Sequence, residues 1–323
     1  MLGRMTSTAS NKHTRGAALA LAGGIGWGLS GACAQFLFGA YGVSPTWVTA
    51  VRMLGAGALL IAVVLARAAT RAQLAAMLRD PAAVGRLALF AVAGLMLCQF
   101  TYLMAIRHSN AGTATVLQYI GPVLIVLVTC LGARRLPTAR EAAAAACVVA
   151  GTYLLATHGD PAVMALSPEG LFWGLAAAVT LVLYTMLPGS LMRRFGSLPV
   201  VACGMLVGGA ALALAGRAWQ VAPTIGAGGL DAAGLFVLVG GMVVLGTAVS
   251  FTAYLQAVTD IGAPRASLMA SVETVSATAF AALWLHTPFA PMDFAGFALI
   301  MATVFLLAKR GERPVGSEAP RPD

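Results

Sequence analysis

Two ionisable residues lie within long apolar stretches of this 323-residue sequence. Arg52 follows Thr46 by six residues, about 9 Å into a helix, and Glu273 follows Arg265 by eight residues, about 12 Å into another. Because an ionised group in lipid costs at least about 2.5 kcal/mol, such residues usually face a cavity or a partner. Arg52 is therefore predicted to bind a carboxylate or another anion, and Glu273 to bind an amine or exchange a proton. The alternative is structural: the two residues pair with each other or with backbone carbonyls.

Uncharged polar and aromatic side chains in the apolar stretches are candidates to line the same cavity. They are Trp27, Gln35, Gln99, Tyr102, Gln118, Tyr119, Trp173, Tyr184 and Tyr254. Gln99 and Tyr102 share one helix face at i, i+3, and Gln118 shares another with Pro122 at i, i+4, so these two faces are predicted to meet the cavity. The alternative roles are hydrogen bonds between helices, worth about 1 kcal/mol each, and anchoring at the membrane interface.

Pro122 lies in the middle of an apolar stretch, where its ring removes a backbone hydrogen bond and clashes with the preceding turn. The sequence therefore predicts a kink near Gln118. Pro122 is a candidate hinge for a conformational change, and simple bending of the helix is the alternative.

Transmembrane helices must position these residues, because 59% of the chain is hydrophobic and only 10% is charged. A spanning helix needs about 20 mostly apolar residues, and strands are excluded because apolar positions do not alternate. The sequence predicts an all-α membrane protein with ten spans joined by short polar loops. We place them at residues 16–38, 46–66, 86–106, 111–131, 139–157, 169–190, 198–217, 232–256, 264–286 and 292–308.

The net charge of +9 does not indicate nucleic-acid binding, because most of the 20 Lys and Arg residues fall in alternate loops. The opposite loops contain only Arg107 and Arg217. By the positive-inside rule, both termini are predicted to lie in the cytoplasm, in a multi-pass protein of a bacterial-type inner membrane.

Enzyme chemistry, metal ions and cofactors are not expected. The five cysteines have no metal-ligand spacing, and no nucleophile has an adjacent base. Gly26-Trp27-Gly28-Leu29-Ser30-Gly31 matches a dinucleotide-binding fingerprint, but it lies within an apolar helix and lacks the preceding strand. Gly24 and Gly28, four residues apart, are better explained by close helix packing.

An internal repeat divides the chain into two related halves. Tyr102-Leu103 and Ala105 recur as Tyr254-Leu255 and Ala257, at an offset of 152, and offsets of 146 and 154 relate earlier residues. Each half has five spans, an odd number, so the second half must cross the membrane in the opposite sense. We predict a cytoplasmic segment at 1–15, repeats at 16–158 and 159–310, and a disordered cytoplasmic tail at 311–323. Inverted repeats of this kind are typical of alternating-access transporters.

Several diffuse motifs carry a family resemblance: Gly24-Ile25-Gly26-Trp27-Gly28, Val51-Arg52-Met53, Asn110-Ala111-Gly112-Thr113-Ala114 to Gly121-Pro122, Gly262-Ala263-Pro264, and Ser271-Val272-Glu273-Thr274. Over residues 16–310 the chain resembles the drug/metabolite transporter superfamily, specifically its EamA-like ten-helix branch. It departs from the family pattern at Thr274, which takes the repeat position of Pro122, and at His286, where many relatives carry an acidic residue.

The resemblance implies a secondary transporter of small organic metabolites, such as amino acids or related compounds, that exports them by alternating access coupled to protons. The alternatives are multidrug efflux, an uncoupled facilitator and, from a different class, a membrane-embedded enzyme or receptor. The expected partners are a small-molecule substrate, protons and the lipid bilayer, and a homodimer is compatible with this picture. A multiply anionic substrate is not expected, since only one Arg lies within a span.

Overall fold

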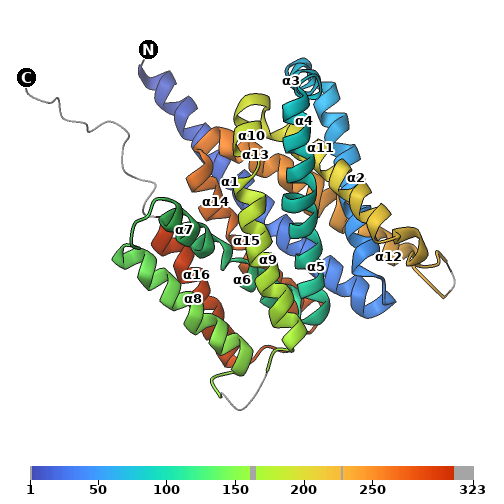
Figure 1. Ribbon diagram of the computed structural model, residues 1–323, viewed down its shortest axis with the longest axis vertical. Helices are drawn as coiled ribbons and strands as arrows, with labels where there is room; N and C mark the ends of the chain where they lie inside the picture. Colours follow the sequence, from blue (N-terminus) through green and yellow to red (C-terminus); the bar gives the residue numbers. More distant parts are fainter. Residues whose placement is uncertain (1, 161–164, 227, 309–323) are drawn as a thin grey trace, which may run out of the picture.

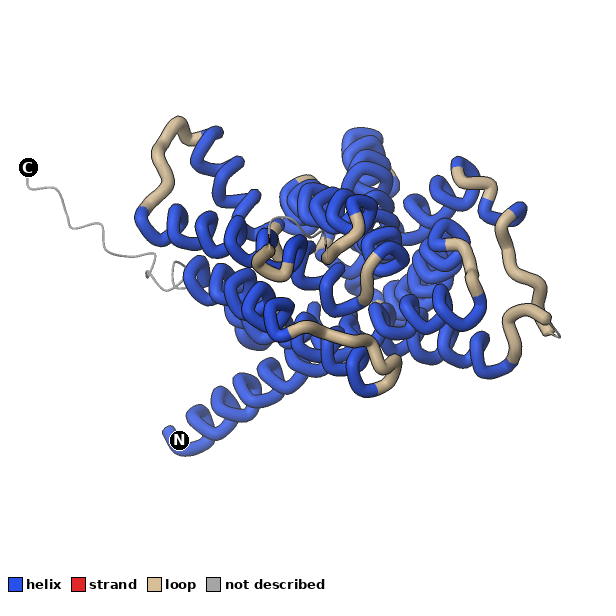
Figure 2. The backbone as a smooth tube through the Cα atoms, turned by 90° about the horizontal axis from the view of Figure 1, so that it is seen from below, coloured by secondary structure: helices blue, strands red, loops and turns tan. Residues whose placement is uncertain are grey.

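The computed structural model describes residues 2–160, 165–226 and 228–308, which fold into a bundle of helices (Figures 1 and 2). Among these residues, nine helices are long and apolar enough to cross a membrane, and a shorter apolar helix covers Pro291–Leu307. Large apolar side chains such as Leu131 and Leu283 point outward, 83% and 79% exposed, as a lipid-facing surface requires. The predicted all-α membrane fold of ten apolar helices is confirmed. The predicted tail, 311–323, lies outside the described residues.

The first half forms five spans, three of them continuous and two of them divided. The continuous ones are α1 (Leu2–Tyr41), α2 (Pro45–Ala66) and α8 (Ala139–Thr157). The third span consists of α4 (Pro81–Leu89), the π-helical η1 (Phe90–Met96) and α5 (Leu97–His108). The fourth span consists of α6 (Ala111–Gln118) and α7 (Gly121–Gly132).

The second half repeats this pattern with one more division. The sixth span consists of α9 (Pro168–Met186) and α10 (Gly189–Phe195), and the seventh is α11 (Ser197–Ala215), followed by the short η2 (Ala218–Gln220). The eighth consists of α12 (Ala232–Phe236), the π-helical η3 (Val237–Val249) and α13 (Ser250–Ile261). The ninth consists of α14 (Ala263–Ala270) and α15 (Val272–Leu283), and the tenth is α16 (Pro291–Ala308).

Two segments are helical beyond the predicted spans. The connection between the second and third spans was expected to be a loop, but it contains α3 (Ala68–Leu78). This segment is rich in Ala, Leu, Arg, Gln and Met, which favour helix whether or not the segment is apolar enough to enter lipid. The segment expected at 1–15 continues α1, which begins at Leu2. Hydropathy marks where a helix meets lipid, and it does not mark where the helix ends.

The helices pack in pairs that the repeat relates. The first span packs against the eighth (α1 with α13), and the sixth packs against the third in the same way (α9 with α5). The second packs against the seventh (α2 with α11), and the fifth against the tenth (α8 with α16). Each pairing maps onto itself or onto another pairing when the halves are exchanged, as two inverted repeats require.

Helix irregularities also recur at equivalent positions. The third and eighth spans each contain a π-helical segment, η1 and η3. The fourth span is interrupted after Gln118, at Tyr119 and Ile120, and the ninth at Ser271. Since Tyr119 and Ser271 are separated by the repeat offset of 152, the two interruptions are counterparts. Helix breaks and π segments of this kind are frequent at functional sites.

Glycines in α1 allow the helix to approach the ninth span closely. A β-carbon added at Gly24 would lie 2.5 Å from the carbonyl oxygen of Ala270, and one added at Gly28 would lie 2.9 Å from that of Glu273. Both distances are shorter than van der Waals contact. The apparent dinucleotide fingerprint thus lies in a continuous helix, where its glycines serve packing.

We predict that Gly28→Ala destabilises the protein, because α1 and α15 would have to separate to admit a methyl group. Overpacking of this kind costs about 1–3 kcal/mol in unfolding free energy. The matched control is Gly39→Ala in the same helix, where a β-carbon would meet nothing within 4 Å. That control should be neutral or stabilising by up to about 1 kcal/mol, because Ala favours helix. Thermal unfolding in detergent tests this, and equal midpoints for the two variants would contradict it.

Candidate functional site

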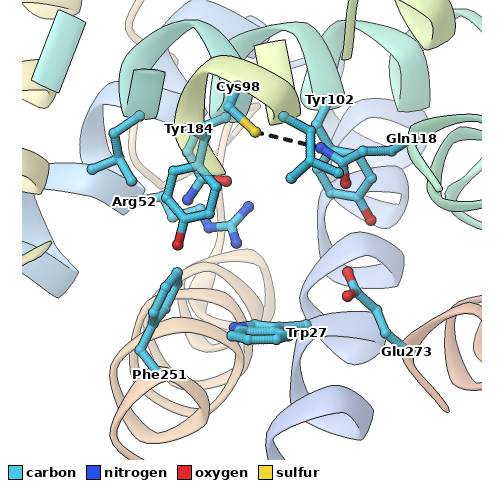
Figure 3. Close-up of a pocket in the computed structure, with 11 residues that line it drawn as sticks. Trp27, Arg52, Cys98, Tyr102, Gln118, Tyr184, Phe251 and Glu273 are labelled. Atoms are coloured by element: carbon cyan, nitrogen blue, oxygen red, sulfur yellow. Dashed lines mark hydrogen bonds between the residues drawn. The ribbon is translucent and has the colours of Figure 1, made fainter. Parts of the chain in front are cut away.

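A cavity of about 120 Å³ lies between helices of both halves (Figure 3). Such a volume admits several water molecules, each of which needs about 10–15 Å³ on this scale. The first, second, third, fourth, sixth, eighth and ninth spans all contribute to its wall. The lining residues are Trp27, Arg52, Leu95, Cys98, Gln99, Tyr102, Gln118, Leu181, Tyr184, Phe251 and Glu273.

Irregular helix segments bring many of these residues to the cavity. Leu95 lies in η1, and Phe251 lies in the first turn of α13, two residues after η3 ends at Val249. Gln118 is the last residue of α6, and Glu273 lies in the first turn of α15. The interruption after Gln118 precedes Pro122, which lacks the N–H that would bond to the Gln118 carbonyl. Part of the cavity wall is thus formed where helical hydrogen bonding changes register.

The guanidinium of Arg52 has a hydrogen-bond partner on one side and lacks one on the other. Its side chain projects from α2, and the residue is only 4% exposed. Its Nε donates a hydrogen bond of 2.9 Å to the hydroxyl of Thr247 in η3, whereas Nη1 is buried and has no hydrogen-bond partner. A guanidinium has five donors and no acceptor, so an open donor here favours an anionic ligand.

Glu273 lies on a different side of the cavity from Arg52, with the Trp27 indole beneath them (Figure 3). The Tyr119 hydroxyl donates a long hydrogen bond of 3.4 Å to Glu273 Oε2. Arg52 and Glu273 form no ion pair within 4.0 Å in this structure, so it favours the interpretation in which each charge remains available to another partner. Two opposite charges therefore line one cavity without neutralising each other at contact distance.

Trp27 forms the floor of the cavity and is held by other rings. Its ring centroid lies 5.2 Å from that of Phe251 and 5.1 Å from that of Tyr254. Its indole Nε1 is buried without a hydrogen-bond partner, and Figure 3 shows this nitrogen toward Phe251 and away from Glu273. Because an indole can only donate, Trp27 and Arg52 together offer two open donors.

Tyr102 offers a hydrogen-bond acceptor to the cavity, in contrast to the donors of Arg52 and Trp27. The Thr115 hydroxyl donates its only proton to the carbonyl of Ala111 at 2.7 Å. The 2.8 Å bond between the Tyr102 and Thr115 hydroxyls must then be donated by Tyr102. The proton of Tyr102 is therefore directed toward α6, and its hydroxyl can only accept from a ligand. Gln118 likewise directs its amide to Cys98, with Nε2 3.5 Å from Sγ.

The structure brings most of the predicted site residues together. Trp27, Arg52, Gln99, Tyr102, Gln118, Tyr184 and Glu273 line the cavity. Tyr119 and Tyr254 contact lining residues without being part of the wall. Trp173 instead packs against Phe100 and Phe172, and Gln35 bonds to Thr287 and to the backbone of Ala111. Pro122 follows the interruption in the fourth span, and its role as a hinge stays a prediction.

Several residues at the site were not predicted: Leu95, Cys98, Leu181 and Phe251 in the wall, and Thr247 behind Arg52. The repeat could have indicated one of them. At the offset of 152, the predicted residue Gln99 corresponds to Phe251. Residues that face a central cavity in one half are expected to have counterparts that face it in the other.

The sequence matches the model of the EamA-like transporter family twice, over residues 14–157 and 168–309. The chain belongs to the EamA-like transporter family. This membership makes it a membrane transporter with two family repeats. It is also 33% identical over 291 residues to a protein of Salmonella typhimurium strain LT2, "Uncharacterized inner membrane transporter YicL", with 89% of this chain and 93% of that protein covered.

The fold of this EamA-like transporter also occurs in a solved crystal structure. The two superpose with a TM-score of 0.57 over 95% of this chain and 99% of the other, at 21% sequence identity. At this identity the similarity extends to the arrangement of the helices, and the chemistry of the cavity has to be argued from the residues of this chain.

We predict that Arg52→Met stabilises the transporter by about 1 kcal/mol or more, because a buried charge with an open donor is replaced by an apolar side chain of similar length. The control is Arg135→Met. Arg135 donates two hydrogen bonds of 2.8 Å to Glu141, so its loss should lower the unfolding midpoint. Thermal unfolding of the two variants tests the contrast. An equal loss of stability in both would indicate that Arg52 is a structural residue.

Proposed function

We propose that this transporter carries a small zwitterionic solute, an amino acid or a related compound, and exports it by alternating access in exchange for protons. The observation that carries the proposal is the pair of opposite charges in one cavity, Arg52 and Glu273, which do not bind each other. A solute with both a carboxylate and an ammonium group could bind Arg52 through the first and Glu273 through the second.

The directions of the hydrogen bonds support this orientation of the solute. The carboxylate would accept from Arg52 Nη1 and Trp27 Nε1, two donors of cavity-lining residues that lack a hydrogen-bond partner. The ammonium group would donate to Glu273, and Tyr102 offers a further acceptor. Charge-assisted hydrogen bonds of this kind are about twice as strong as neutral ones.

The size of the cavity favours a metabolite over a drug. Pockets that enclose drug-sized ligands usually measure about 300–1,000 Å³, whereas this cavity measures about 120 Å³. The few charges in its wall also disfavour a sugar phosphate or another multiply anionic solute. Multidrug efflux is therefore the weaker alternative, and an uncoupled facilitator differs from the proposal only in the role of Glu273.

Proton coupling follows from competition for one carboxylate. Glu273 can hold a proton or a substrate amine, and not both at once. If it is protonated on the side from which protons enter and binds the amine on the other side, each cycle exchanges one for the other. The interruptions of the fourth and ninth spans, on either side of the Tyr119–Glu273 contact, are where we expect the helices to bend.

We predict that Glu273→Gln abolishes efflux driven by a pH gradient while the protein remains in the membrane, because glutamine keeps the shape but cannot hold the exchanged proton. The measurement is a metabolite-wide screen of efflux from cells that overexpress the chain, followed by flux across vesicles with an imposed pH gradient. The control is Glu169→Gln, an exposed residue in the first turn of α9. Undiminished flux in the Glu273 variant would rule out the coupling role.

Orientation follows from the distribution of charge, and we propose that both termini lie in the cytoplasm. Reporter domains that are active on one side of the membrane only, fused after residue 310 and within the connection that holds Asp80, should both report the cytoplasmic side. A fusion next to Arg217 should report the opposite side. Opposite signals for the terminus and the Asp80 connection would contradict this topology.

A further inference from the structure

In the hydrogen bond between Arg52 and Thr247, the donor and the acceptor can be assigned. Thr247 is completely buried, and its hydroxyl donates a hydrogen bond of 2.8 Å to the carbonyl of Met242, five residues earlier in η3. A hydroxyl has a single proton, so Thr247 can only accept from Arg52, whose Nε lies 2.9 Å away. The π-helical turn thus prepares an oxygen lone pair for the guanidinium.

This contact limits where the guanidinium can go. With Nε bound to Thr247 on the eighth span, the guanidinium would lose this hydrogen bond if it turned away toward the ninth span, and Nη1 remains buried without a partner. Long basic side chains in membranes otherwise extend toward the interface or a nearby carboxylate. The hydrogen bond to Thr247 therefore favours the observed orientation of the guanidinium, in which Arg52 and Glu273 form no ion pair.

The repeat provides an independent argument. At the offset of 154, Arg52 corresponds to Leu206, and at the offset of 152, Thr247 corresponds to Leu95. The seventh span packs against η1, as the second packs against η3, so the counterpart of the Arg52–Thr247 pair is a pair of leucines. A contact needed only to hold the two halves together would not require a charge and a hydroxyl on one side of the pseudo-symmetric bundle alone.

We infer that Thr247 is a positioning residue for substrate recognition: its hydroxyl holds the Arg52 guanidinium in the orientation that receives the substrate carboxylate. The inference rests on the proposed function and extends it from the residues that touch the solute to one that acts through Arg52. It predicts that the apparent affinity for carboxylate-bearing solutes depends on the hydroxyl at position 247.

Four variants separate the hydroxyl from the shape of the side chain. Thr247→Val removes the hydroxyl and keeps the branched shape, and Thr247→Ala removes it without adding bulk. Thr247→Ser restores the hydroxyl. Thr303→Val is the matched control, since Thr303 is equally buried, donates to a backbone carbonyl within α16 and does not line the cavity.

The first measurement follows the NMR signal of the Arg52 side chain. In the full chain, purified in lipid nanodiscs with ¹⁵N-labelled arginine, the Arg52 Nε–H resonance is assigned by its loss in Arg52→Lys. Thr247→Val and Thr247→Ala should shift this resonance and speed its exchange with water, whereas Thr247→Ser and Thr303→Val should leave it in place. An unchanged resonance in both the Val and Ala variants would overturn the inference. This NMR measurement does not depend on a transport assay.

The second measurement determines the apparent affinity for the substrate. Proteoliposomes receive an equimolar mixture of the twenty L-amino acids, and the initial flux of each is followed by mass spectrometry. Thr247→Val should raise the KM of the transported amino acid about tenfold, with the maximal rate changed by less than about twofold, because a hydrogen bond to a charged group is lost. Thr247→Ser should restore the KM of the native chain. A lower maximal rate at unchanged KM would contradict a positioning role.

The two measurements distinguish this inference from the proposed function. Native vesicles that move none of the twenty amino acids would contradict the proposed substrate class, and with it the substrate part of the assignment. The Arg52 resonance would still test whether Thr247 orients the guanidinium.

Discussion

A charged side chain within a membrane protein needs partners for its hydrogen-bonding groups, and the surroundings of Arg52 meet that need only in part. Thr247 binds Nε, while Nη1 is buried and has no partner. A buried donor without a partner lowers the stability of a protein by about 1–3 kcal/mol, and by more when the group is charged. The rest of the fold has to offset this cost. The separation of Arg52 from Glu273 leaves the guanidinium without an ion-pair partner in the described part of the protein. The arrangement is consistent with a protein whose partner is a solute that arrives and leaves.

Irregular helices make such a site possible in a bundle whose segments are otherwise regular. A regular helix satisfies its own backbone and presents only side chains, whereas a π segment or a break shifts the register and changes which side chains face inward. The third and eighth spans use π segments, and the fourth and ninth use breaks, at positions that the repeat relates. Glu273 follows one break, and Gln118 precedes the other. The site is thus built where the two halves deviate from ideal helix in the same way.

The sequence was most informative where a residue conflicts with its surroundings. Arg52 and Glu273 stand out because charges are rare in apolar spans, and polar residues such as Gln99 and Gln118 stand out for a similar reason. Thr247 does not, because hydroxyl residues in membrane helices usually bond to their own backbone, and only the three-dimensional fold shows which of them meets Arg52. Trp173 was misleading for the opposite reason: its counterpart Trp27 is in the cavity wall, but Trp173 packs against Phe100 and Phe172. Helix α3 went unrecognised because hydropathy measures fit to lipid, whereas helix propensity acts at the surface as well.

Symmetry of the backbone and asymmetry of the side chains have different consequences for transport. In the proposed alternating-access mechanism, the related helix pairs would supply two conformations of similar energy. Binding, in contrast, needs a distinct set of groups, and the equivalent positions carry different chemistry: Arg52 corresponds to Leu206, and Glu273 to Gly121, at offsets of 154 and 152. Both charges therefore belong to one arrangement of groups, and no second copy of the site exists at the symmetry-related positions. A solute bound there would interact with the two halves unequally, so its binding and release can favour one conformation over the other. In the proposed exporter, this inequality would allow a nearly symmetric bundle to couple solute movement to a direction.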